Sequence, residues 1–362
     1  MSIAGGASSK IRDLVHARVE LEKRLQAEPA EPSEKAIAEY ERAYSRLQRS
    51  LAHLFGEAED EQDRVTIMLE LIRILENKLV YLQNFAIDPT SDNRMFASLV
   101  DRFIEELSGS GSPVLTPLES TYYRAIAALY AGDRIGARQG FSAACSSEES
   151  DEANDIKYKS YVILGNLSHE EHEYEEARKL HDASLRYSTN DNVTAQALAF
   201  KALNSYALHE YDEALELFER ALELFDREAP LFNAYFYRNA LLFCGAIHYD
   251  RKAYDTAGEY YDRVLREVDQ SSYDYFDALG QLGRMSYLSG RFEEAGAQFD
   301  RAIESHRFGD NEALMDTYFW MAKTRIRQNR LDEAKSWLEK VTTSSVRYEN
   351  KPKAMELLQK VG

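Results

Sequence analysis

The chain has 362 residues, with 62 acidic and 44 basic side chains, a formal net charge of -18 at pH 7 and a pI near 5.0. This charge argues against nucleic acid and anionic membrane surfaces as general partners, because phosphate binding requires a basic stripe that the sequence lacks. Residues 1–10 contain no apolar signal segment and no stretch approaches the ~18 apolar residues of a membrane span, so we expect a cytoplasmic protein without membrane insertion.

The N-terminal quarter is expected to be a helical bundle. Residues 1–10 are expected to be disordered, and 11–107 contain four stretches with apolar residues at helical spacing: 11–25, 37–54, 65–82 and 96–107. Pro29, Pro32 and Pro89, and Gly56 with the acidic turn that follows it, separate these stretches, which favours helices folded back on one another. The alternative is a coiled-coil arm that docks a partner or forms a homodimer through the N-terminal helices.

A linker is predicted at 108–116, where Ser and Gly alternate up to Pro113. Thr116, Pro117 and Glu119 then have the spacing of a capping box that starts a helix. We therefore place a repeat array at 117–345 and a C-terminal capping helix at 346–362.

Six alanines recur along this array at steps of 37 to 43 residues: Ala137, Ala177, Ala214, Ala257, Ala295 and Ala334. In the clearest copies an aromatic residue stands three positions before the alanine and another stands four positions after it, as in Tyr211 and Phe218 around Ala214. Gly165, Gly245 and Gly283 mark the preceding helix, where two helices must approach closely. Self-similarity at this period indicates a solenoid of helical hairpins.

Over residues 118–342 this pattern of large and small residues resembles the tetratricopeptide repeat (TPR) family. The resemblance implies an all-α fold, a right-handed α-solenoid of about six long hairpins preceded by the N-terminal bundle. The period departs from the family, because it averages near 39 residues where about 34 is usual.

The sequence predicts no enzyme, no catalytic residue, no metal site and no cofactor. It contains no Gly-x-Ser-x-Gly, and carboxylate pairs such as Glu293 and Glu294 recur beside each signature alanine, as expected for the solvated face of a helix. His169 and His172 are three residues apart, whereas a two-histidine metal site on one helix face needs four. We interpret them as part of a polar loop.

Helical phase identifies a candidate partner-binding groove on the first helix of each hairpin. Its predicted members are Asn166, Tyr206, Asn239, Tyr249, Arg284, Tyr287, Phe319 and Lys323. Tyrosines recur at one phase, and tyrosine is enriched at interfaces, but they would also serve as packing residues between the helices of a hairpin. Some members of the family capture a terminal carboxylate with a Lys and an Asn one turn apart; Val162 stands where that Lys would precede Asn166.

The leading hypothesis is a non-enzymatic scaffold or adaptor that binds a protein or peptide segment in the groove. The alternative is a regulatory sensor, in which the array binds a peptide or small ligand and repositions the N-terminal bundle against a target. The acidic charge favours a basic partner in either case.

Overall fold

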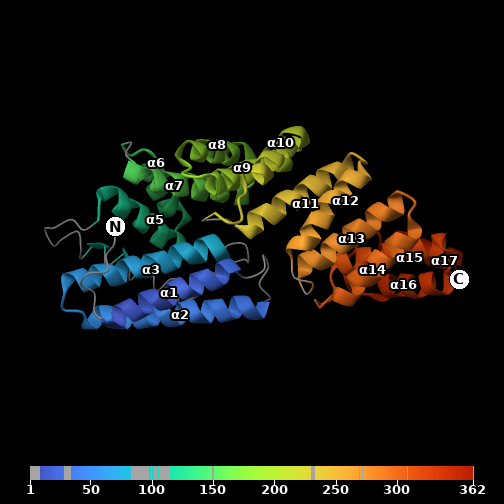
Figure 1. Ribbon diagram of the computed structural model, residues 1–362, viewed down its shortest axis with the longest axis horizontal. Coiled ribbons are helices and arrows are strands. Elements are labelled where there is room, and N and C mark those ends of the chain that lie inside the picture. Colours follow the sequence, from blue (N-terminus) through green and yellow to red (C-terminus); the bar gives the residue numbers. More distant parts are fainter. Residues whose placement is uncertain are drawn as a thin grey trace. The chain divides into compact units, whose positions relative to one another are not determined.

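The computed structural model describes residues 9–27, 34–82, 98, 100, 101, 104, 105, 115–148, 151–229, 233–268, 270, 272–307 and 309–361. Across these ranges the regular elements are helices, and no strand occurs. The chain divides into two compact units (Figure 1): the first holds Ser33–Glu210 together with the residues up to Glu28, and the second holds Tyr211–Gly362.

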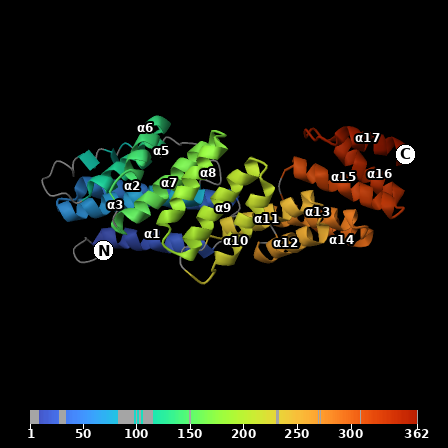
Figure 2. The same cartoon turned by 90° about the horizontal axis from the view of Figure 1, so that it is seen from above.

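The first unit begins with three helices that pack against one another: α1 (Ser9–Ala27), α2 (Glu34–Glu57) and α3 (Glu61–Leu82). They lie side by side in both Figure 1 and Figure 2. The apolar stripes read from the sequence supply their core, with Ile11, Tyr44 and Met68 at most 2% exposed. Residues 1–8, most of the fourth expected helix at 96–107 and the linker residues 108–114 lie outside the described residues.

Helical hairpins follow in the first unit. They are α5 (Pro117–Ala131) with α6 (Arg134–Cys145), then α7 (Asp151–Glu170) with α8 (Tyr174–Ser184) and the 3₁₀ turn η2 (Leu185–Tyr187), then α9 (Asp191–Ala207). The predicted capping box begins α5: the Thr116 hydroxyl accepts from the Glu119 N–H at 3.1 Å, and the Thr116 N–H donates to the Glu119 carboxylate at 2.8 Å. One continuous apolar core joins α1–α3 to α5–α7.

The second unit contains α10 (Tyr211–Leu224) and then three hairpins with a final helix. The hairpins are α11 (Ala234–Asp250) with α12 (Tyr254–Glu267), α13 (Tyr273–Leu288) with α14 (Phe292–Ser305), and α15 (Glu312–Arg327) with α16 (Leu331–Thr343). The last helix, α17 (Lys351–Val361), packs on α16. The fold is an all-α solenoid, which confirms the prediction.

The recurring small residues lie where the helices of a hairpin meet. All six signature alanines are fully buried. A Cβ atom built on Gly283 would stand 2.7 Å from the Phe299 ring, and one on Gly245 would stand 2.9 Å from the Tyr261 ring. The glycine of the first helix therefore leaves the space that the aromatic ring of the second helix fills.

Each hairpin also turns in the same way. The residue two positions before the second helix has a left-handed backbone, with φ between 60° and 86°: Gly132, His172, His209, Lys252, Gly290 and Asn329. The N–H of the following residue donates back to the first helix, as from Glu173 to the Ser168 carbonyl at 2.8 Å. This closes the first helix with its terminal carbonyls satisfied.

Candidate functional site: a cation–aromatic cluster in the second unit

The candidate site lies on the first helices of the second unit, where equivalent positions of successive hairpins carry related residues. Eight residues before each second helix stand Arg284 on α13 and Lys323 on α15. Five residues before it stand Tyr249 on α11 and Tyr287 on α13. Only α13 carries both residues, about one helical turn apart, because Ala246 takes the cation position on α11 and Ile326 takes the tyrosine position on α15.

Stacking of the hairpins places each cation on the tyrosine of the preceding hairpin. The Arg284 guanidinium carbon is 4.5 Å from the centre of the Tyr249 ring. The Lys323 amine is 5.0 Å from the centre of the Tyr287 ring. Contacts of this kind are attractive because the ring face carries negative charge. The same contact therefore occurs at two successive hairpin junctions.

Trp320 on α15 joins the two contacts. Its ring centre is 3.5 Å from the Lys323 amine and 5.0 Å from the Arg284 guanidinium carbon, and it meets the Tyr287 ring edge-on at 5.2 Å. Phe319 lies 5.5 Å from the Lys323 amine on the same helix. We call Tyr249, Arg284, Tyr287, Phe319, Trp320 and Lys323 the cation–aromatic cluster.

The carboxylate of Asp316 borders this cluster. One of its oxygens is 3.9 Å from an Arg284 nitrogen, and the other accepts a hydrogen bond of 2.6 Å from the Tyr348 hydroxyl. Tyr348, in the loop between α16 and α17, is buried and meets Phe319 edge-on at 6.2 Å. The loop thereby fixes the carboxylate beside the arginine.

The pKa values of the cluster follow from its partial burial. Burial lowers the pKa of Lys323 to about 8, and the positive charge of Arg284 adds to the effect while Asp316 opposes it. Burial raises the pKa of Asp277 on α13 to about 6, helped by the charge of Asp274. Burial likewise raises the pKa values of Tyr249 and Tyr287. Lys323 and Asp277 therefore hold their charges less firmly than surface groups do.

The other predicted groove residues are not members of this cluster. Tyr206 is half-buried on α9 in the first unit, whereas Tyr249 and Tyr287 belong to the second. Asn239 is half-buried on α11 beside Arg238, a fully buried arginine that pairs with Asp274. Tyr249 and Tyr287 also contact the aromatic residue that begins their own second helix, at 5.9 and 5.4 Å between ring centres.

Asn166 takes part in a buried polar network. The Asn204 amide nitrogen donates to Nδ1 of His181 at 2.9 Å, so Nε2 carries the proton and donates to the Asn166 oxygen at 3.2 Å. His169 Nδ1 donates to the Asn204 oxygen at 2.8 Å. The Asn166 side chain therefore serves packing between α7, α8 and α9.

Sequence reasoning missed Trp320, Asp316 and Tyr348. Helical spacing could have identified Trp320 and Asp316. They lie on the same helix as Lys323, one turn and two turns before it. Tyr348 had none, because it follows the last repeat and reaches Asp316 only through the folded chain.

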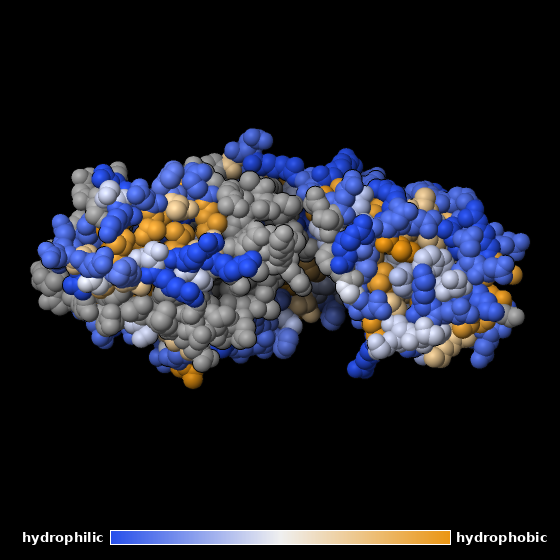
Figure 3. Space-filling model, turned by 90° about the horizontal axis from the view of Figure 1, so that it is seen from below, coloured by the Kyte–Doolittle hydropathy of each residue, from blue (hydrophilic) through white to orange (hydrophobic). Residues whose placement is uncertain are grey.

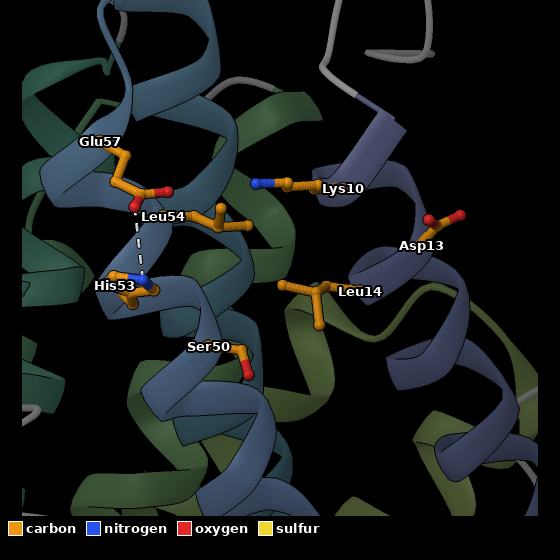
Figure 4. A pocket seen from close by; sticks show the side chains of 7 residues that line it. All are labelled: Lys10, Asp13, Leu14, Ser50, His53, Leu54 and Glu57. Atoms are coloured by element: carbon orange, nitrogen blue, oxygen red, sulfur yellow. Dashed lines mark ion pairs between the residues drawn. The ribbon is translucent and has the colours of Figure 1, made fainter.

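A concavity lies in the N-terminal bundle (Figure 4). It has a volume of about 380 Å³ and lies between the start of α1 and the end of α2. His53 and Glu57 form an ion pair of 3.4 Å along its rim. The lining mixes apolar and polar side chains: Lys10, Asp13, Leu14, Ser50, His53, Leu54 and Glu57. Figure 3 shows apolar atoms at the surface of the first unit among hydrophilic ones.

Neither metal ligation nor membrane crossing has a structural basis in the ranges given above. No three His, Cys, Asp or Glu side chains of the described residues converge on a point where an ion could sit. His172 occupies a hairpin turn, and its Nδ1 bonds the Tyr174 hydroxyl at 2.7 Å. Within the same ranges, no helix combines the length and the apolar character that a membrane span needs.

Comparisons with known proteins agree with the repeat architecture. A family model described as tetratricopeptide repeat matches residues 316–345, which are nearly all of α15 and α16. No curated protein matches the sequence. The apo form of the quorum sensor NprR from B. thuringiensis has a similar fold, with 18% identity, 83% of this chain and 81% of that chain covered, and a TM-score of 0.52.

Two further solved structures match with lower TM-scores. YrrB, described as a TPR protein with an unusual peptide-binding site, is 20% identical, covers 55% of this chain and 91% of its own, and has a TM-score of 0.43. A tetratricopeptide repeat protein from Parabacteroides merdae is 14% identical, covers 81% and 98%, and has a TM-score of 0.43. The family model thus identifies a tetratricopeptide repeat at residues 316–345, and the structure with a TM-score above 0.5 shares the fold of the chain.

Proposed function

We propose that this protein is a non-enzymatic binding scaffold that holds a peptide segment of a partner protein on the first-helix face of the second unit. The observation that carries the proposal is the repeated contact of a half-exposed cation with a half-exposed tyrosine, Arg284 on Tyr249 and Lys323 on Tyr287. Tyrosine, tryptophan and arginine are the residues that most often dominate binding energy at protein interfaces. The net charge of -18 favours a segment that is basic overall.

The test starts from peptides selected on the immobilised full-length protein from a random dodecapeptide library. Affinities of selected peptides are then measured by fluorescence anisotropy for the wild type, Tyr249→Leu and Tyr287→Leu. We expect each variant to bind at least about tenfold more weakly, because truncating a hot-spot tyrosine costs about 2 kcal/mol or more and a tenfold change corresponds to about 1.4 kcal/mol.

Tyr318→Leu is the matched control. Tyr318 also lies on α15 and has a lysine over its ring, Lys340 at 5.2 Å, but it packs against Trp337 of α16. The control should bind normally. The proposal would be contradicted if the selected peptides bound Tyr249→Leu and Tyr287→Leu as tightly as the wild type, while tryptophan fluorescence showed that both variants were folded.

A second candidate is the regulatory sensor, favoured by the apolar core that α1–α3 share with α5–α7. Movement of the first hairpins would be transmitted to a bundle that shares their core. The quorum sensor NprR resembles the chain in fold alone. X-ray scattering with and without a selected peptide separates the candidates: a scaffold keeps its dimensions, and a sensor changes them.

A further inference from the structure

The cation–aromatic cluster carries more positive than negative charge, in a chain that is strongly acidic overall. In the residues that the structure describes, no carboxylate oxygen lies within 4.0 Å of the Lys323 amine. Arg284 reaches a single carboxylate, at 3.9 Å, and its buried Nε atom has no hydrogen-bond partner there. Other arginines of the unit have closer pairs, such as Arg291 with Asp255 at 2.9 Å and Arg325 with Asp300 at 2.8 Å.

The aromatic rings around the cations make this excess of positive charge energetically unfavourable in the free protein. Trp320, Tyr287 and Phe319 replace water around the Lys323 amine, and partial burial disfavours its charged form. A carboxylate placed between the two cations would restore the lost electrostatic stabilisation through charge-assisted hydrogen bonds. The site therefore has the chemistry of an anion receptor with apolar walls.

We propose that the cluster binds one acidic side chain, an Asp or Glu of the bound segment, whose carboxylate lies between Arg284 and Lys323. This inference rests on the proposed function and specifies the partner. A side chain fits better than a chain terminus, because each cation lies against a half-exposed ring: Arg284 against Tyr249 on α11, and Lys323 against Tyr287 on α13. A segment that continues in both directions can cover both rings.

The site accepts one acidic residue and disfavours several. Asp316 already borders Arg284, and its negative charge adds to burial and to the charge of Asp274 in raising the pKa of Asp277. Further carboxylates in the segment would meet these groups and the overall negative charge of the protein. The expected ligand is a neutral or basic segment with a single Asp or Glu.

The experiment uses two random dodecapeptide libraries. In one the peptide is fused at its C-terminus, so that only side-chain carboxylates are available, and in the other the C-terminus is free. We expect the fused library to yield peptides with Asp or Glu at one fixed position. Replacing that residue by Asn or Gln should weaken binding about tenfold, as expected for a charge-assisted hydrogen bond.

Protein variants locate the effect. In Lys323→Met the acidic peptide and its Asn or Gln variant should bind about equally well. Lys323→Arg should restore the preference for the acidic peptide, because the positive charge returns. Lys340→Met is the matched control, since Lys340 lies 3.8 Å from the Trp337 ring centre on the α16 side of the same unit. It should retain the full discrimination.

Three results would overturn the inference. Peptides without an acidic preference that still depend on Tyr249 and Tyr287 would refute it while leaving the proposed function intact. An acidic preference seen only with free C-termini would assign the site to a chain terminus instead. Failure of both libraries to yield any peptide that depends on the two tyrosines would remove the proposed function and this inference with it.

Discussion

His181 shows how a single residue adapts a repeat to its neighbours. Other hairpins place a ring at this position, such as Phe218 or Phe299, and His181 also lies flat against one, the Phe200 ring at 4.9 Å. Its two nitrogens bond Asn166 and Asn204, so the buried ring is satisfied only as the neutral imidazole. Burial accordingly lowers the pKa of His181 to about 3.

This pKa predicts that acid destabilises the first unit. Between pH 6.5 and about 3 the unfolded state binds a proton at His181 that the folded state does not, so stability is full above pH 6.5 and falls as the pH decreases. At pH 5 the loss from this residue should be about 2 kcal/mol relative to pH 7.5. Urea unfolding followed by circular dichroism measures it.

His181→Phe supplies the comparison. The variant should lose that share of the pH dependence, although its stability at pH 7.5 falls because Asn166 and Asn204 lose a partner. Equal pH dependence in the variant and the wild type would show that His181 protonates without cost in the folded protein.

At the scale of elements, glycines define how closely the two helices of a hairpin approach. Gly283 on α13 and Gly258 on α12 are both helical, but their surroundings differ. A Cβ atom on Gly283 would stand 2.7 Å from the Phe299 ring, whereas one on Gly258 would have ordinary contact with Leu282 at 3.7 Å. Phe299 is 1% exposed and cannot move aside.

The two glycines should therefore respond to alanine with opposite signs. Gly283→Ala should destabilise the second unit by about 1–3 kcal/mol through overpacking. Gly258→Ala should stabilise it by up to about 1 kcal/mol, because alanine is the better helix former and the space exists. Urea unfolding of both variants by tryptophan fluorescence is the measurement; a Gly283→Ala variant as stable as the wild type would contradict the close-approach argument.

At the scale of the whole molecule, tryptophan fluorescence reports on one of the two units. Both tryptophans, Trp320 and Trp337, belong to the second unit, so their fluorescence follows that unit alone. In the first unit, the N-terminal helices and the first hairpins share one core, in which Tyr122 of α5 and Ile67 of α3 are buried. We propose that the helices of 11–107 cap the repeat array of 117–345.

Deletion of residues 1–114 tests this division. Because it uncovers the apolar face of α5, the circular dichroism transition should move to lower urea or broaden. The tryptophan transition should stay where it is in the full-length protein, since the second unit has its own core. A tryptophan transition that moves with the deletion would show that the units unfold as one.

The sequence by itself determined the repeat, the helices and the places where they touch. Spacing within single helices can be recognised in a sequence, because an α-helix has 3.6 residues per turn. This spacing gave the alanine and glycine positions, the capping box at Thr116 and the phase of Arg284, Tyr287 and Lys323.

Only the tertiary structure decided which of these residues meet. Arg284 contacts Tyr249, which lies 35 residues earlier in the chain. Tyr348, which follows the last repeat, donates a hydrogen bond to Asp316, and the Asn166 side chain forms a hydrogen bond with His181. The division of the chain between Glu210 and Tyr211 likewise has no local signal. These outcomes depend on how the hairpins stack and how long side chains reach across their junctions, and helical periodicity carries no information about either.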